Sequence, residues 1–380
     1  MGPLEGFRII ELTGIGPGPF CGMLLSDLGA EIISIERPGG GSRDDAVCMR
    51  NRRSVCVDLK QPEGVELVLD LCESADAIYE GFRPGVAERL GLGPEVCRQR
   101  NPGLVYGRIT GWGQTGPLAQ AAGHDINYIS LSGALHAIGR AGERPLPPLN
   151  LAGDYGGGGL FLALGILSAL LEKSRSGQGQ VVDASMVEGS AALMAVFYGL
   201  HAQGLHSTER GTNLLDTGAP FYEVYETLTE SGQAPQYVSV GPLEPQFYAM
   251  LVKAVGGEQT DFYPQHATDA WPRRKEQLAA IFGQKSRDEW CELLEGTDAC
   301  FAPILSLTEA PGHPHNQARG SFVTVDGVTQ PAPAPKFSRS QPATPSAAVP
   351  QGHDTEAVLA EMGYTAEKLA ALRSSGAVPV

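Results

Sequence analysis

The sequence predicts an α/β protein with a large Rossmann-like domain, built on a parallel sheet, and a smaller α+β domain. Three observations favour this fold class. Short apolar runs alternate with helix patterns from residue 8 to residue 109, which is typical of parallel βαβ units. From Pro220 the pattern changes to two neighbouring strands followed by helices. Residues 330–350 are rich in Pro, Ala and Ser, as an extended connector would be.

The first third of the chain is expected to supply strands, each a short apolar or β-branched run, at residues 8–12, 31–35, 54–59, 75–79 and 104–109. Helices are expected between them at residues 20–28, 62–72, 85–90 and 94–98. Pro62 suits a first helical turn, because an amide at that position has no acceptor within the helix. Sheets of this kind bind ligands outside the carboxyl ends of their strands, so we expect the functional site there.

The middle of the chain predicts helices at residues 127–137, 155–173 and 186–198, with a strand at 180–183. The longest apolar stretch, residues 160–171, is too short to span a bilayer and predicts a buried helix instead. The following segments predict a hairpin of strands 221–228 and 237–240, then helices at 244–254, 274–282 and 287–294. Two terminal helices, 353–361 and 366–372, are expected to dock back onto the first domain.

These elements predict the domain organisation. We expect a large domain over residues 1–200, completed by residues 330–380, because the terminal helices return to it. Residues 201–219 are polar and irregular, which predicts a linker. Residues 220–329 are expected to form the small α+β domain.

The composition narrows the possible functions. The chain has 380 residues and a formal net charge of −15, which argues against nucleic acid as a partner, because phosphates would be repelled. With 42% hydrophobic residues, the chain is expected to be folded despite its 49 Gly and 28 Pro. The seven cysteines have no metal-binding spacing, so we expect reduced buried thiols and no metal site.

No targeting signal is recognised in the sequence. The amino-terminal residues lack the basic and apolar regions of a signal peptide, and Pro379-Val380 is not a peroxisomal address. The expected location is therefore a cytoplasm of the bacterial type, with a peroxisome or mitochondrion as the alternative in a eukaryote.

Three titratable residues at turns are candidates for chemistry. His124 opens a polar cluster before a helix, where its ring is either an acid/base group or a cap. Asp154 precedes four consecutive glycines, Gly156 to Gly159. An N-cap is the simplest role for this aspartate, but glycine costs about 1 kcal/mol per helical position, which indicates that the backbone closely approaches a ligand or another helix. Glu244 lies at a strand-to-helix turn, where an ordinary first-turn carboxylate is the alternative.

Several common nucleotide and hydrolase motifs are absent from the sequence. It contains neither a G-x-x-x-x-G-K-[ST] phosphate loop nor a G-x-S-x-G nucleophile elbow. Residues 14–18 match a dinucleotide fingerprint only loosely. Pro17 and Pro19 remove amide donors that a pyrophosphate would need, which argues against NAD.

Several separated motifs together resemble a known enzyme family. They are PGPFC at 17–21, DLKQP at 58–62, GHDINY at 123–128, MVEG at 186–189 and EPQFY at 244–248. GTDAC at 296–300 and RGSF at 319–322 follow the same pattern. In this order, the motifs resemble the α-methylacyl-CoA racemases of the family III CoA-transferase (CaiB/BaiF) superfamily, from residue 4 to about residue 363.

The resemblance implies a fold, a substrate and a reaction. It implies two domains in an interlocked homodimer, which agrees with a chain that returns to its first domain. It also implies that the 2-methyl centre of 2-methylacyl-CoA thioesters is racemised through an enolate, with coenzyme A as part of the substrate and no separate cofactor. The same resemblance makes His124 and Asp154 the acid/base groups for opposite enantiomers, and makes Glu244 the partner that fixes the His124 tautomer. Two carboxylate or imidazole groups can act in this way when their environments shift their pKa values.

The coenzyme A portion needs a local basic site on an acidic chain. Arg37 is expected at the carboxyl end of the second strand, where such sheets bind ligands. The resemblance adds further contacts, and for Lys60 and Arg83 an ordinary solvated side chain remains the alternative. The full set is Arg37, Val57, Asp58, Leu59, Lys60, Arg83, Gly123, Asp125, Ile126, Asn127 and Tyr128. Backbone amides near His124 and Asp125, or after Asp154, are candidates for stabilising the enolate oxygen.

Two other functions remain open. In a CoA transferase of the same superfamily, Asp154 would attack the thioester and form a covalent intermediate. In a non-catalytic CoA-binding protein, neither His124 nor Asp154 would be needed for turnover. The acyl chain is unassigned, because Met186, Met194 and Leu215 suit either an acyl channel or the core.

Overall fold

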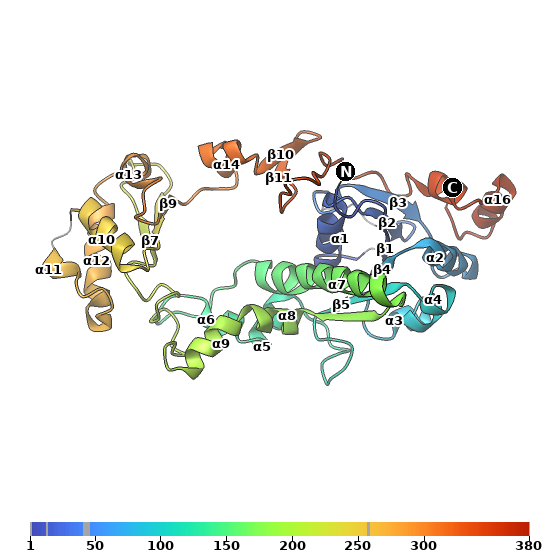
Figure 1. Cartoon of the computed structure of the whole chain (residues 1–380), viewed down its shortest axis with the longest axis horizontal. Coiled ribbons are helices and arrows are strands. Elements are labelled where there is room, and N and C mark those ends of the chain that lie inside the picture. Colours follow the sequence, from blue (N-terminus) through green and yellow to red (C-terminus); the bar gives the residue numbers. More distant parts are fainter. Residues whose placement is uncertain (1, 13, 41–45, 257–258, 380) are drawn as a thin grey trace. The chain divides into compact units, whose positions relative to one another are not determined.

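The structure is a computed structural model that describes residues 2–12, 14–40, 46–256 and 259–379. The chain divides into two compact units (Figure 1). The first comprises Met1–Ser132, Leu149–Met194 and Pro314–Val380, and the second comprises Gly133–Pro148 and Ala195–His313. The units differ in extent from the expected domains: residues 133–148 and 195–200 group with the second unit, and 314–329 with the first. The expected linker, residues 201–219, also groups with the second unit, and the domain boundaries stay a prediction.

A six-stranded parallel sheet forms the centre of the first unit, which confirms the fold class. Its order is β3-β2-β1-β4-β5-β6. The strands are β1 (Arg8–Leu12), β2 (Glu31–Glu36), β3 (Arg52–Cys56), β4 (Ala77–Glu80), β5 (Val105–Thr110) and β6 (Val181–Ser185). The strand order changes direction between β1 and β4. The chain segments that follow these two strands therefore leave on opposite faces of the sheet. This opens a crevice at the carboxyl ends of β1 and β4.

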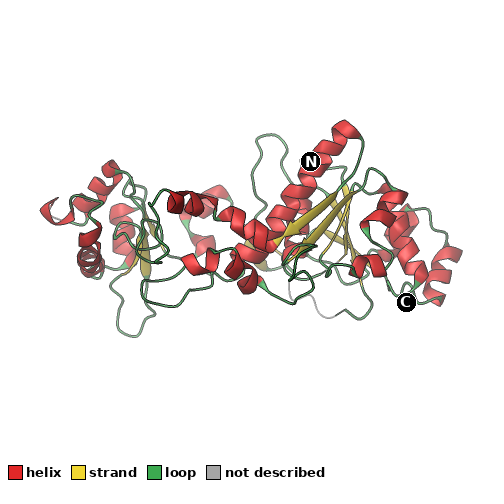
Figure 2. Cartoon of the chain, turned by 90° about the horizontal axis from the view of Figure 1, so that it is seen from below, coloured by secondary structure: helices red, strands yellow, loops and turns green. Residues whose placement is uncertain are grey.

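Helices cover both faces of this sheet (Figure 2). Successive strand residues face opposite sides: Ile10, Ile33 and Ile78 belong to one buried cluster, and their neighbours Ile9 and Ile32 belong to the other. The helices of this unit are α1 (Pro17–Asp27), α2 (Pro62–Ser74), α3 (Val86–Arg89), α4 (Pro94–Arg100), α5 (Asp125–Leu131), α7 (Leu160–Ser176), α8 (Met186–Leu193), α14 (Pro314–Arg319), α15 (Thr355–Glu361) and α16 (Ala366–Ser374). The predicted strands and helices of the first third are all present; β1 has the predicted ends, and those of the other elements are shifted by one or more residues.

Two helices that the sequence predicted as continuous are broken. The helix expected at residues 127–137 is α5 followed by α6 (Ala134–Ala137), because Gly133 adopts a left-handed conformation with φ of 84°. The helix expected at 186–198 is α8 followed by α9 (Ala195–Ala202), with the break at Met194. Both breaks coincide with boundaries between the two units.

The long helix expected to begin at Tyr155 begins earlier and has a different winding. Leu151–Gly159 forms a π-helix (η1) that continues into α7. Asp154 therefore lies inside this helix, and the alternative of an N-cap is wrong. The glycines allow close packing against protein neighbours. A Cβ at Gly157 would lie 2.6 Å from the Ser190 amide nitrogen, and one at Gly159 would lie 2.6 Å from the Pro17 carbonyl oxygen.

The carboxyl-terminal helices dock onto the first unit, as expected. Val358, Leu359 and Leu372 are buried in the same cluster as Ile10 and Ile33. An unpredicted hairpin, β10 (Phe322–Val325) and β11 (Val328–Pro331), precedes the extended connector. The two-residue Asp-Gly turn at 326–327 is a recognised hairpin signal that the sequence interpretation overlooked.

The second unit holds a small antiparallel sheet of β7 (Glu223–Glu226), β8 (Tyr237–Val240) and β9 (Phe301–Pro303). The predicted hairpin is confirmed, whereas β9 was not predicted. Its helices are α9, α10 (Pro245–Ala254), α11 (Gln259–Phe262), α12 (Trp271–Phe282) and α13 (Arg287–Leu294), with α6 from the earlier segment. Short 3-10 turns lie at η2 (Thr268–Ala270) and η3 (Ala310–Gly312). Its core contains Phe221, Tyr248 and Phe282.

One helical run of the described chain, Leu151–Ser176, is long and apolar enough to meet the length and composition criteria for a membrane span. Core helices meet the same criteria, and α7 packs against β5, β6 and α1. Its buried face includes Leu162, Ile166 and Leu170. The expectation of a buried helix is therefore only partly right, because an opposite face of α7 is exposed.

Candidate active site

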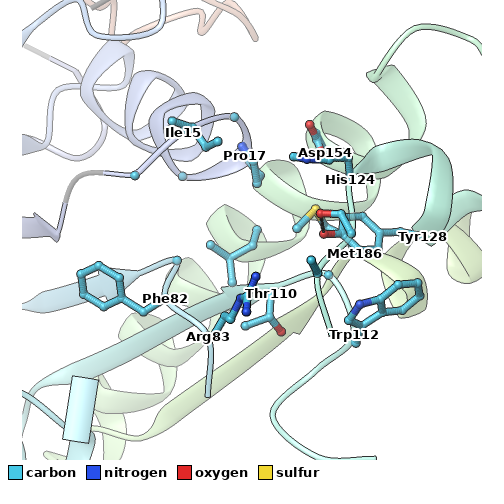
Figure 3. A pocket seen from close by; sticks show the side chains of 18 of the residues that line it. Ile15, Pro17, Phe82, Arg83, Thr110, Trp112, His124, Tyr128, Asp154 and Met186 are labelled. Atoms are coloured by element: carbon cyan, nitrogen blue, oxygen red, sulfur yellow. Dashed lines mark hydrogen bonds between the residues drawn. The ribbon is translucent and has the colours of Figure 1, made fainter. Parts of the chain in front are cut away.

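A cavity of about 450 Å³ lies at the carboxyl ends of β1, β4 and β5 in the first unit. This is the point at which the strand order reverses, so the fold itself creates the opening. The cavity is lined by the β1–α1 turn, the segment after β4, the segment after β5, and single residues of the π-helix and α8. Both His124 and Asp154 line it (Figure 3), which brings together two of the three residues predicted to be catalytic.

His124 is held at the N-cap position of α5 by its neighbours. Its backbone is extended, with φ of −134°. Its amide donates a hydrogen bond of 3.0 Å to Asn127 Oδ1, and the Asn127 amide donates to the His124 carbonyl oxygen at 2.8 Å. The side chain of Asn127 thus fixes the turn that carries His124, and its expected contact with coenzyme A stays a prediction.

Asp154 is half-buried on the π-helix and accepts a hydrogen bond of 3.2 Å from Asn150 Nδ2. Burial raises the pKa of the Asp154 carboxyl, and the nearby Asp125 carboxylate raises it further, against the hydrogen bond from Asn150 and the charge of His124. The hydrogen bond from Asn150 to Asp154 was not predicted, because the apolar pattern predicted a helix only from residue 155. In this environment, the Asp154 carboxyl is therefore protonated more readily than the carboxyl of an exposed aspartate.

The turn between β1 and α1 closes one side of the cavity beside Asp154. Gly16 has a φ of 67°, and a Cβ at this position would lie 3.4 Å from Asp154 Oδ2. Ile15, next to it, is 84% exposed and lines the cavity. A glycine at position 16 thus allows both the left-handed backbone and the close approach to the carboxylate.

Tyr128 supports the segment before His124. Its hydroxyl donates to the Gly123 carbonyl oxygen, and its ring meets Trp112 edge to face with centroids 4.8 Å apart. A Cβ at Gly111 would lie 2.0 Å from the Tyr128 ring, so only glycine allows this packing. Tyr128 lines the cavity, while its hydroxyl is already engaged with the backbone.

Arg83 lines the cavity from the segment after β4. The preceding Glu80 fixes this segment, since its Oε2 accepts from the Phe82 amide at 2.6 Å and its Oε1 accepts from Arg108 Nε at 2.8 Å. Burial raises the pKa of the Glu80 carboxyl against these contacts. Arg83 is therefore the predicted basic residue that the structure places in the same cavity as His124 and Asp154.

The predicted coenzyme A contacts that follow β2 and β3 lie outside this cavity's lining. Arg37 and Lys60 are exposed and follow β2 and β3, on the same edge of the sheet. The side chain of Val57 is fully buried in the core. Asp58 Oδ1 accepts from the Lys60 amide at 2.9 Å, which shapes the turn that also contains Leu59.

Residues of the GHDINY motif divide between exposed and buried roles. Ile126 is largely exposed, at 45%. The carboxylate of Asp125 is buried and accepts from backbone amides of the π-helix, so this side chain faces protein. Gly123 lines the cavity.

Glu244 belongs to the second unit, where it is the N-cap residue of α10. Gln265 Nε2 donates to the Pro242 and Leu243 carbonyl oxygens at 3.2 and 3.0 Å, which fixes the turn before Glu244. The pairing of Glu244 with His124 stays a prediction, because the two residues lie in different units. Among the described residues, no group of three His, Cys, Asp or Glu side chains is arranged to hold a metal ion.

Comparisons with known proteins agree with this geometry. The model of the family described as CoA-transferase family III matches residues 4–355. The alpha-methylacyl-CoA racemases of Mus musculus and Homo sapiens are 47% and 44% identical over 375 residues, covering 98% of this chain and 96% of each relative. The succinyl-CoA–D-citramalate CoA-transferase of Chloroflexus aurantiacus is 33% identical, covering 85% of this chain and 83% of that protein. A solved CaiB/BaiF family protein from Brucella suis has a TM-score of 0.80 at 26% identity, covering 95% and 99% of the two chains.

Proposed function

The chain belongs to CoA-transferase family III, and we propose that it is an isomerase that racemises 2-methylacyl-CoA thioesters at carbon 2. The observation that carries this proposal is the presence of His124 and Asp154 in one cavity. Relatives named alpha-methylacyl-CoA racemase, at 44–47% identity over nearly the whole chain, support the same activity. A transferase has no need of a second proton carrier beside its aspartate.

The proposed reaction moves a proton between the two faces of carbon 2. One group removes the proton, and the electron pair of the broken C–H bond is delocalised onto the thioester oxygen as an enolate. The other group then donates a proton to the opposite face. His124 and Asp154 exchange these roles when the opposite enantiomer is the substrate. The raised pKa of Asp154 helps it to hold the proton that it must donate.

The enolate oxygen needs hydrogen-bond donors that are already in place. The amides of Gly153 and Asp154 are engaged by the Asp125 carboxylate. The amides of Asp125 and Ile126 are at the first positions of α5, which have no acceptor within a helix. These contacts favour the α5 amides beside His124 over the glycine-rich amides after Asp154.

Coenzyme A is proposed to lie along the carboxyl edge of the sheet as part of the substrate, with no separate cofactor. Arg83 in the cavity, with Arg37 and Lys60 beyond it, supplies positive charge for its phosphates on a chain of net charge −15. The acyl group is proposed to contact Ile15 and Met186, which line the cavity with apolar surface.

A homodimer, interlocked as the sequence resemblance implies, is part of the proposal. Leu160, Leu164 and Leu171 expose one apolar face of α7, at 50%, 57% and 66%. Such a face is typical of a subunit contact. We expect light scattering to give twice the chain mass of 40.1 kDa, and a mass of one chain at micromolar concentration would contradict the dimer. In a dimer, the Glu244 that meets His124 can come from the partner chain.

Proton NMR in heavy water tests the proposed reaction. We expect the purified protein to exchange the carbon-2 proton of a single enantiomer of a 2-methylacyl-CoA for deuterium and to lose its optical purity, with no acceptor acid added. The buffer alone and heat-denatured protein are the controls. Retention of both the proton and the optical purity would contradict racemase activity.

The CoA-transferase reaction is the second candidate. It is supported by the 33% identical CoA-transferase and by the half-buried Asp154, which resembles a protected nucleophile. In the same NMR tube, a transferase would leave carbon 2 unchanged and would move CoA to an acceptor acid once one was added. Hydroxylamine would trap Asp154 as a hydroxamate if its carboxyl were activated in a covalent intermediate.

A further inference from the structure

We propose that the Asp125 carboxylate is a positioning group that holds Asp154 in place relative to His124, an inference that rests on the proposed function. Asp125 directly follows His124 in the chain and is only 5% exposed. Its Oδ2 accepts hydrogen bonds from the Gly153 amide at 2.6 Å and from the Asp154 amide at 2.8 Å. One side chain therefore joins the start of α5 to the π-helix that carries the second acid/base group.

The surrounding atoms are shaped for this contact. A Cβ at Gly153 would lie 2.3 Å from Asp125 Oδ2, so only glycine allows the carboxylate to reach both amides. The other oxygen, Oδ1, is buried and has no hydrogen-bond partner among the described residues. A buried carboxylate with an unpaired oxygen costs free energy, and the two amide bonds offset that cost only while the π-helix keeps its present position.

Charged and titratable groups surround this contact. His124 directly precedes Asp125, and Tyr128 lies on the same helix. Asp154 faces Asp125 from the π-helix. Arg83, in the segment after β4, interacts electrostatically with Tyr128. The negative charge of Asp125 also favours the protonated form of Asp154. The side chain thus affects both the place and the proton affinity of Asp154, while His124 is held separately by Asn127.

This arrangement predicts an unequal kinetic effect. In Asp125→Asn, the side-chain oxygen still accepts both amide bonds, but without the charge, so the hold on the π-helix weakens. We expect racemisation to fall about tenfold in both directions, because every turnover needs Asp154. Deuterium exchange into the enantiomer whose proton faces Asp154 is expected to fall by the same factor. Exchange into the enantiomer that faces His124 is expected to stay within about threefold of the native rate, since His124 can remove and return a proton alone.

The measurement is the rate of deuterium incorporation into each pure enantiomer of a 2-methylacyl-CoA, together with kcat and KM for racemisation. KM is expected to change little, because Asp125 faces protein and not the cavity. Gly153→Ala is the second variant. Its added methyl group pushes the carboxylate away from the same amides, so the same inequality between enantiomers is expected.

Asp216→Asn is the matched control, because the Asp216 carboxylate accepts from the Gly211 and Asn213 amides at 2.8 and 2.7 Å in the second unit. Its kinetics are expected to equal those of the native protein. Equal losses for both enantiomers in Asp125→Asn, or native rates in a variant with native Tm, would overturn the positioning role. If the native protein itself neither exchanges nor racemises, the proposed function fails instead, so the two failures are distinguishable.

Discussion

Replacing His124 with alanine is expected to lower racemisation about a thousandfold in both directions, because each turnover needs one group to remove a proton and another to return it. The loss of deuterium exchange is expected to be unequal. The enantiomer whose proton faces His124 loses exchange by a similar factor. The enantiomer that faces Asp154 keeps most of its exchange, since Asp154 can remove and return the proton on its own face. Asp154→Asn is expected to give the mirror-image result.

The measurement is deuterium incorporation into each pure enantiomer, followed by NMR, beside optical rotation for racemisation. His136→Ala is a suitable control, because His136 is exposed and belongs to the other unit, outside the cavity. Equal loss of exchange for both enantiomers in His124→Ala would mean that one group serves both faces. The two-base assignment would then have to be abandoned, although the isomerase activity would stand.

Replacing Arg52 with leucine is expected to lower the free energy of unfolding by about 3–5 kcal/mol. Arg52 Nε donates to Glu11 Oε2 at 3.0 Å, and both side chains are 0% exposed. Arg52 also donates to the Pro19 carbonyl oxygen at 2.7 Å, in the first turn of α1 beside the cavity. Without Arg52, the Glu11 carboxylate stays buried without a compensating charge, although Ser34 Oγ still donates to it at 2.7 Å.

Urea unfolding of both proteins measures this difference. The neighbouring Arg53 is the matched control, because it alternates to the other face of β3 and makes partly exposed ion pairs with Glu31 and Glu361 at 2.7 Å. Arg53→Leu is expected to cost no more than about 1 kcal/mol. If the two variants lost equal stability, burial would not be what makes the Arg52 pair important.

Local patterns in the sequence were sufficient to predict the parallel sheet. The strands of the first third are short segments rich in apolar and β-branched residues, because both faces of the sheet are covered by helices. The start of β3 was missed by two residues, since Arg52 and Arg53 resemble a polar turn. Arg52 is nevertheless buried, because Glu11 from a distant part of the chain neutralises it.

The π-helix could not be predicted in the same way. Apolar periodicity does not separate a π turn from an α turn, and the glycines are explained only by neighbours far away in the sequence. Ser190 packs against Gly157, and Pro17 packs against Gly159. The Asp125 carboxylate packs against Gly153. Of the two alternatives that the glycine cost left open, close approach to another helix is the one that the structure supports. The contact of Asn150 with Asp154 depends on the same winding.

The proposed catalytic pair was predictable mainly because several motifs together resembled one family. His124 and Asp154 are 30 positions apart, and no local pattern says that they share a cavity. The order of the strands does this, because the segments after β4 and β5 and the turn after β1 meet at one end of the sheet. Glu244 is in the other unit, so neither local pattern nor the arrangement within one unit can pair it with His124.

The first unit is built from three separate stretches of the chain, so its core is completed late in synthesis. Val358, Leu359 and Leu372 fill the same buried cluster as the central strands β1 and β2, on one face of the sheet. That face therefore stays open until these residues have left the ribosome. Every residue of the second unit has been made once His313 is in place. The growing chain thus has all the residues of its second unit while the first unit still exposes apolar surface, a stage at which association with chaperones is most useful.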